Sequence, residues 1–312
     1  MAPRFLWILT LIIAVFSTSS VCAQQYNFKT YTAKNGLGSA IVNCIYQDSR
    51  GDIWFGTQSG GVSRFNGSTF KSFTKTNGLV GNDVLCITED LEGNVWFGSL
   101  DGASKFSGDT LINYNDTTGL KVNRGIYAIH VDKENRIWFG SRGGGLITLE
   151  DGKFTSYTTE DGLPSNNVFA IVQTPDQKIW LACSKGVASF DGNTFEIQEI
   201  SAGRTFFCAA TGPNESVWFG GTPGNGVLVH RNGEFAELEL PADITDDFIG
   251  SVAKDSRGRM WFATDHGVLK YVEGEFQLFT QETGLSANAV LSVSSDREGN
   301  VWIGTHGGGV NL

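Results

Sequence analysis

The four histidines are the residues of this sequence best suited to acid–base chemistry or metal binding near neutral pH. They are His130, His230, His266 and His306. No two of them have the short spacing within one element that metal sites use, so we expect neither a metal ion nor another cofactor. His266 and His306 occupy equivalent places in two neighbouring sequence repeats. There they either face a common pocket or are ordinary loop residues.

Two other patterns that look chemical are better explained as turns. Aspartates that could indicate carboxylate catalysis or calcium binding precede five tryptophans, at Asp48, Asp90, Asp132, Asp255 and Asp296. Asp-x-x-Gly ahead of a strand is typical of a tight turn, in which the carboxylate accepts backbone N–H groups and the glycine is left-handed. The glycine tracts Arg142–Gly145 and His306–Gly309 lack the Lys-Ser/Thr and the helix of a phosphate-binding loop.

Three of the cysteines, Cys44, Cys86 and Cys208, each stand ten residues before a tryptophan, where other repeats have Ala or Ser. This position therefore requires a small side chain, and cysteine behaves as a small hydrophobic residue. Disulfides form in exported proteins, but equivalent positions in different repeats are too far apart for disulfide geometry. We expect free, buried thiols, including Cys183.

The residue fourteen positions before each tryptophan gives the most informative set: Ala40, Asn82, Arg124, Asn166, Arg204, Asp247 and Asn288. Six of these are polar or charged, whereas the residue two positions further on is apolar in every repeat. Variation at an otherwise uniform position is typical of a binding surface, and the alternative is that these residues only cap strands and meet solvent. Further candidates for the same surface lie in nearby glycine-containing loops: Arg142, Lys185, Asp265, His266 and His306.

A repeat of about 42 residues must position these side chains. The tryptophans at 54, 96, 138, 180, 218, 261 and 302 are spaced by 42, 42, 42, 38, 43 and 41 residues. One repeat predicts four strands separated by turn signals, at 42–47, 53–57, 62–65 and 70–74. The second strand is apolar on both faces, as expected where small sheets stack face to face around an axis. The sequence therefore predicts an all-β, seven-bladed β-propeller.

The two ends of the sequence are predicted to close the ring. Phe28–Thr32 matches Phe70–Thr74, the fourth strand of the first repeat, whereas the last repeat ends after its third strand. Residues 26–32 should therefore pair with the blade formed by 288–312 and remove open sheet edges. Residues 24–312 then form a single domain. The connections between blades, and those between the second and third strands, should share one face around the axial channel.

The first 23 residues are predicted to be a cleaved secretory signal. A short apolar stretch, Phe5–Phe16, precedes the small-residue exit Val21-Cys22-Ala23. We therefore expect a periplasmic or secreted protein that does not insert into a membrane after cleavage. The formal net charge of −10, without a Lys/Arg cluster, argues against nucleic acid as a partner.

The repeated phrase resembles the two-component regulator propeller repeat over nearly the whole mature sequence. The phrase is Gly-Leu-x-x-Asn, as in Gly162–Asn166, followed by Asp-x-x-Gly-x-Ile/Val-Trp-Phe-Gly-Thr and Gly-Gly-Val, as in Asp48–Val62. The resemblance implies the exported sensor part of a bacterial hybrid histidine kinase, often tied to glycan degradation. Such proteins usually continue into an immunoglobulin-like domain, a membrane helix and a kinase. No signalling output domain is recognised in this sequence.

Three functions remain open from the sequence. The leading hypothesis is a sensor propeller that binds a small polar ligand, with an oligosaccharide as candidate, and whose macromolecular partner is a membrane sensor kinase or another exported protein. The second is an interaction platform without a small ligand. The third is an enzyme similar to streptogramin lyases, although the sequence offers no definite carboxylate set beside His266 and His306. Aromatic side chains beside the polar ring would favour sugar binding.

Overall fold

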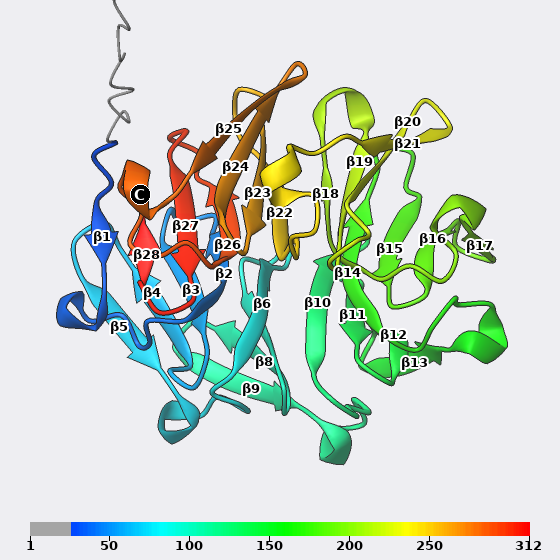
Figure 1. Cartoon of the computed structure of the whole chain (residues 1–312). Helices are drawn as coiled ribbons and strands as arrows, with labels where there is room; N and C mark the ends of the chain where they lie inside the picture. Colours follow the sequence, from blue (N-terminus) through cyan, green and yellow to red (C-terminus); the bar gives the residue numbers. More distant parts are fainter. Residues whose placement is uncertain (1–25) are drawn as a thin grey trace, which may run out of the picture.

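The computed structural model describes residues 26–312, which form seven four-stranded antiparallel sheets arranged around one axis (Figure 1). The first strand of each blade lines the axis, and the fourth lies at the outer rim (Figure 1). The described residues therefore form a seven-bladed β-propeller, as the sequence predicts. The predicted secretory signal lies outside the described residues.

The strands follow the repeat closely. Blades 1 and 2 contain β2 (Val42–Gln47), β3 (Ile53–Thr57), β4 (Val62–Phe65) and β5 (Phe70–Phe73), then β6 (Val84–Glu89), β7 (Val95–Ser99), β8 (Gly102–Ser107) and β9 (Thr110–Tyr114). Blades 3 and 4 contain β10 (Ile126–Val131), β11 (Ile137–Ser141), β12 (Gly145–Glu150) and β13 (Lys153–Tyr157), then β14 (Val168–Gln173), β15 (Ile179–Cys183), β16 (Gly186–Phe190) and β17 (Phe195–Ile197). Blades 5 and 6 contain β18 (Phe206–Thr211), β19 (Val217–Gly221), β20 (Val227–Arg231) and β21 (Glu234–Leu238), then β22 (Ser251–Lys254), β23 (Met260–Thr264), β24 (Gly267–Val272) and β25 (Glu275–Phe279). Blade 7 contains β26 (Val290–Ser295), β27 (Val301–Thr305), β28 (Val310–Asn311) and β1 (Thr30–Tyr31).

Short 3-10 helices begin the connections between blades, with one more in the first turn of blade 5. They are η1 (Ala33–Asn35), η2 (Lys75–Asn77), η3 (Asp116–Thr118), η4 (Thr159–Asp161), η5 (Glu199–Ser201), η6 (Pro213–Glu215), η7 (Ala242–Ile244) and η8 (Gln281–Thr283). At η2, the Thr74 N–H donates to Asn77 Oδ1 at 3.0 Å, and Gly78 follows in the left-handed region with φ of 105°. The predicted fourth strand therefore ends at Phe73 rather than Thr74, because Thr74 caps the helix.

Closure of the ring through blade 7 is confirmed. Thr30 and Tyr31 of β1 pair with Asn311 and Val310 of β28, and Lys29 exchanges two backbone hydrogen bonds with Leu312 at 2.9 and 3.0 Å. The paired strand is shorter than predicted. The Tyr26 N–H donates to Thr283 O at 2.8 Å, which draws the chain away from blade 7 towards blade 6.

The tryptophans pack between neighbouring blades. Trp54 of blade 1 lies 5.3 Å from the ring of Phe97 in blade 2, and Trp138 of blade 3 lies 5.9 Å from the ring of Phe190 in blade 4. Both tryptophans are at most 2% exposed. Each sheet therefore has both faces covered, which accounts for the continuous apolar run of its second strand.

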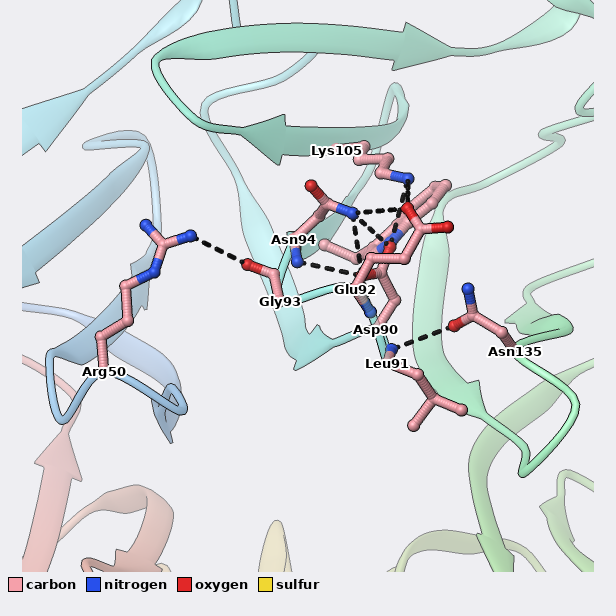
Figure 2. A network of polar contacts seen from close by, with 9 residues as sticks. Arg50, Asp90, Leu91, Glu92, Gly93, Asn94, Lys105 and Asn135 are labelled. Carbon is pink, nitrogen blue, oxygen red and sulfur yellow. Dashed lines mark hydrogen bonds and ion pairs between the residues drawn. The ribbon is translucent and has the colours of Figure 1, made fainter.

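The repeated aspartates are confirmed as turn residues, and they have a second role. Asp90 Oδ1 accepts the backbone N–H groups of Glu92 and Asn94, while Oδ2 accepts the indole N–H of Trp96 at 2.9 Å. Figure 2 shows this network, in which Lys105 Nζ lies 3.2 Å from Asp90 Oδ2. The same indole-to-carboxylate bond recurs in four other blades, at Trp54–Asp48, Trp138–Asp132, Trp261–Asp255 and Trp302–Asp296.

The turns that carry these aspartates also join the blades. The Arg50 guanidinium of blade 1 donates to Gly93 O at 3.3 Å, and the Leu91 N–H donates to Asn135 Oδ1 of blade 3 at 3.0 Å (Figure 2). Hydrogen bonds between neighbouring blades therefore connect the turns on this face of the propeller.

Candidate functional site

An axial cavity of about 490 Å³ lies between the inner strands of the blades. Its wall is built by the first strand of each of the seven blades, so all seven repeats contribute to one site. A closed ring of inner strands provides a rigid frame, because every strand in it is held by its own sheet.

In six of the seven blades a backbone irregularity places one residue of the inner strand against this cavity. In these blades the pairing of the first and second strands shifts by one residue. In blade 1 the shift falls between Val42 and Cys44, so Asn43 has no opposite residue in the second strand. An unpaired residue at a β-bulge turns its side chain away from the regular ladder, and bulges are common beside functional sites. The six bulge residues line the cavity: Asn43, Leu85, Tyr127, Phe169, Phe207 and Leu291. Gly250 takes the equivalent sequence position in blade 6, which has no bulge.

Four aromatic side chains gather on one side of the cavity wall. Tyr127, Phe169, Phe207 and Phe248 come from blades 3 to 6, and each is half-buried. Phe169 and Phe207 are stacked with ring centroids 4.8 Å apart, whereas Tyr127 meets Phe169 edge-on at 5.5 Å and Phe248 meets Phe207 edge-on at 5.1 Å. The opposite side carries the small or aliphatic Leu85 and Leu291, with Asn43 as the polar member. We call the four rings the aromatic wall.

The cysteine positions are confirmed as small residues that pack between inner strands. Cys208 Sγ lies 3.3 Å from Ile249 O of the next blade, and a Cβ on Gly220 would overlap that sulfur. Burial raises the pKa of the Cys86 and Cys208 thiols to about 12. The four cysteines within residues 26–312 are free, and Cys183 and Cys208 are buried, whereas Cys44 and Cys86 are half-buried against the cavity.

The predicted polar ring lies on one face with the loops between second and third strands. Gly61 N–H donates to Asn82 O of the next blade at 2.9 Å, and Gly143 N–H donates to Asn166 O at 2.8 Å. The asparagine side chains also bind the backbone: the Oδ1 atoms of Asn82, Asn166 and Asn288 accept N–H groups of Lys75, Thr159 and Gln281, at 2.8, 2.8 and 2.6 Å. Capping thus uses one oxygen of each asparagine and leaves its amide N–H groups available.

Two other members of the ring are held by partners. Arg204 donates to Glu237 Oε1 at 2.7 Å and to Asn225 O, in a groove on the rim of blade 5. Asp247 is buried, and its Oδ1 lies 2.6 Å from Nδ1 of His266, whose side chain is 65% exposed. The carboxylate therefore orients the imidazole, and its Nε2 faces away from this bond. The partner of His266 is Asp247 rather than the neighbouring Asp265.

The remaining candidate residues are exposed. Arg124, Arg142 and Lys185 belong to blades 3 and 4, and within residues 26–312 their side chains make no hydrogen bond or ion pair. Asp265 is exposed in blade 6, and His306 is exposed in blade 7, where its backbone N–H donates to Ala289 O at 2.8 Å. The structure thus places the eleven predicted residues on one face but joins only Asp247 and His266 directly.

The aromatic wall is the feature that sequence reasoning missed. A sequence feature that could have indicated it is the variation at the position eleven residues before each tryptophan. This position holds Asn, Leu, Tyr, Phe or Gly, whereas its neighbours stay apolar or small. Phe248 lies two residues before that position in blade 6. A strict alternation of inward and outward residues hides this position, since only the bulge turns it into the cavity.

Seven blades, tryptophan-centred repeats and a common loop face define the described residues as a repeat propeller with an axial cavity. Family comparison matches the two-component regulator propeller at residues 36–59, 119–143, 162–185, 243–266 and 284–307. Five of the seven repeats therefore match the repeat of this family. The curated proteins give no match in sequence. Within residues 26–312, no helix is long and apolar enough to cross a membrane.

Solved structures share the fold at low identity. The extracellular domain of BT4673 from B. thetaiotaomicron, described as belonging to a hybrid two-component system, is 22% identical with a TM-score of 0.76, covering 93% of this chain and 39% of that structure. Virginiamycin B lyase from Staphylococcus aureus is 14% identical with a TM-score of 0.73, covering 91% and 97%. PorZ of Porphyromonas gingivalis, a surface component of the type-IX secretion system, is 16% identical with a TM-score of 0.71, covering 90% and 48%. The chain thus spans about two fifths of the BT4673 structure.

Proposed function

We propose that the protein is an exported sensor propeller that binds an oligosaccharide at the mouth of its axial cavity. The observation that carries this proposal is the aromatic wall beside the polar ring. Sugar rings offer C–H faces that pack on aromatic side chains and hydroxyls that pair with amides and guanidinium groups. Export is supported by the predicted signal, and sensing by the regulator-type repeats.

The distance between the two parts of the site suits an oligomeric ligand. Tyr127, Phe169 and Phe207 each lie on an inner strand, three positions after a polar-ring residue in the connection that precedes the strand. Three residues span at most roughly 10 Å, the value for fully extended chain, so both sets of residues are within reach of one short oligosaccharide. A ligand that enters from the loop face can therefore contact the ring residues with one unit and the aromatic wall with another.

A glycan panel tests this proposal. Binding is found by thermal shift and measured by calorimetry with the mature protein and with Phe169→Leu and Phe207→Leu. Each substitution should weaken binding up to about tenfold, since an aromatic stacking contact contributes about 0.5–1.5 kcal/mol. Phe154→Leu, at a half-buried ring on the outer strand of blade 3, is the matched control. Equal affinity in all variants would place the site elsewhere, and a panel without any binder would refute oligosaccharide recognition.

A second candidate function rests on the Asp247–His266 pair. A buried carboxylate that orients an exposed imidazole is suited to general-base chemistry, as a lyase requires. Turnover of a streptogramin B antibiotic that disappears in His266→Ala would favour this candidate. Absence of turnover at high enzyme concentration would remove it.

A further inference from the structure

Three cations on the loop face have no protein partner among the described residues. Arg124, Arg142 and Lys185 are exposed, and each lies near the start or the end of a strand in blades 3 and 4. Elsewhere among the described residues, eight lysines and arginines form ion pairs, as in Lys75–Asp101, Arg204–Glu237 and Arg259–Asp255, whereas scattered ones such as Lys153 and Arg257 do not. A group of unpaired cations in a protein of net charge −10 therefore needs an explanation.

Backbone hydrogen bonds bring these three residues onto one continuous surface. Arg142 N–H donates to Gly125 O, next to Arg124, at 3.1 Å. Arg142 also forms a β-bridge with Asn167, whose carbonyl accepts the N–H of Ser184, next to Lys185, at 3.2 Å. The cations thus flank the same stretch of inner strands that carries Tyr127 and Phe169, and we call them the basic cluster.

At blade 6 the same face carries acidic residues without lysine or arginine. The connection into blade 6 carries Asp243 and Asp246, both exposed, and Asp265 is exposed in the next loop of that blade. The connections into blades 3 and 4 also carry exposed carboxylates, at Asp116, Glu160 and Asp161, so the difference lies in the cations, which the connection into blade 6 lacks. The charge pattern would therefore orient a ligand that has one acidic end.

We infer that the oligosaccharide is acidic, and that a sugar carboxylate binds at the basic cluster while a neighbouring ring packs on the aromatic wall. Arginine suits this role because its planar fork can give two parallel hydrogen bonds to a carboxylate. The inference rests on the proposed function, and it adds the ligand class and the residues that select it.

The test uses uronic-acid trisaccharides derived from polygalacturonate, alginate and hyaluronan, each paired with its methyl ester. The ester keeps the sugar rings and removes the negative charge. Calorimetry should show an acid that binds at least about tenfold more tightly than its ester, because charge-assisted hydrogen bonds are lost in the ester. Raising NaCl from about 50 to 500 mM should weaken binding of the acid and leave the ester unchanged.

Substitutions assign the preference to the basic cluster. Arg124→Gln and Arg142→Gln together should bring the acid down to the affinity of the ester. Arg257→Gln is the matched control, because Arg257 is an exposed arginine in a turn on the opposite face. Like each substitution in the basic cluster, it removes one positive charge. A neutral glycan that binds as well as any acid would overturn the inference and leave the proposed function standing. Failure of every acid in the panel would also overturn the inference.

Discussion

Replacing Trp138 tests the packing between blades and the aspartate–tryptophan bond separately. Trp138 is 2% exposed and belongs to a buried cluster with Val168, Leu181 and Phe190 of the next blade. Its indole N–H donates to Asp132 Oδ2 at 2.8 Å. Trp138→Ala removes both interactions and leaves a cavity, so it should reduce the free energy of unfolding by about 3–5 kcal/mol.

Trp138→Phe retains most of the packing and removes the N–H donor. Asp132 would still accept hydrogen bonds from Arg136 and from two backbone N–H groups. We therefore expect a smaller loss of about 1.5–3 kcal/mol, the usual contribution of a hydrogen bond to a charged group. Urea unfolding followed by circular dichroism measures both values. A loss of under about 1 kcal/mol for Trp138→Ala would refute the packing of this residue between blades, and equal losses for the two variants would refute the separation of the two effects.

Three further predictions concern closure, pH and the Cys208 thiol. Deleting residues 26–32 should expose the edge of β28 and cause aggregation or a large drop in melting temperature; a deletion that melts like the full mature chain would contradict closure by β1. Burial alone would raise the pKa of Asp132, but hydrogen bonds from Trp138 and Arg136 outweigh burial and lower this pKa in the folded protein. The ionised carboxylate therefore contributes to the free energy of unfolding above about pH 3.9, and this contribution is lost as the pH falls through the folded pKa. The stability gap between the native protein and Asp132→Asn should accordingly shrink from pH 7 to pH 3 in urea titrations, and a constant gap would argue against this linkage. Cys208 is buried, and burial raises the pKa of its thiol to about 12, so it should react slowly with iodoacetamide at pH 8 and rapidly in urea; fast labelling of Cys208 in the native protein would contradict its burial.

The strands and turns of this protein are well predicted from the sequence, because the same local pattern of apolar runs and turn residues recurs in seven repeats. The predicted strands 42–47, 53–57 and 62–65 coincide with β2, β3 and β4. Ring closure also follows from sequence, since Phe28–Thr32 repeats the pattern of Phe70–Thr74. These features depend on turn chemistry and apolar runs, which are local and periodic.

The site is harder to predict because it depends on departures from the repeat. The bulge that turns Phe169 into the cavity is a backbone irregularity without a distinctive residue type. The Oδ2 bond from Asp132 to Trp138 spans six positions and requires the turn to bring the two side chains together. The partner of His266 is likewise set by how the loop folds back on Asp247, and the neighbouring Asp265 is equally plausible from sequence.

The closing blade has a consequence for how the chain folds. Thr30 and Asn311 lie 281 residues apart in sequence, whereas the other six blades are each built from consecutive strands. Contacts of such long separation carry a large loop-closure entropy and form slowly. During synthesis the first six blades can fold while β1 waits for its partner, so blade 7 should assemble last. Until then β1 has no pairing partner and its edge is exposed. If the chain is exported unfolded, this partly folded intermediate forms only after export, away from other nascent chains.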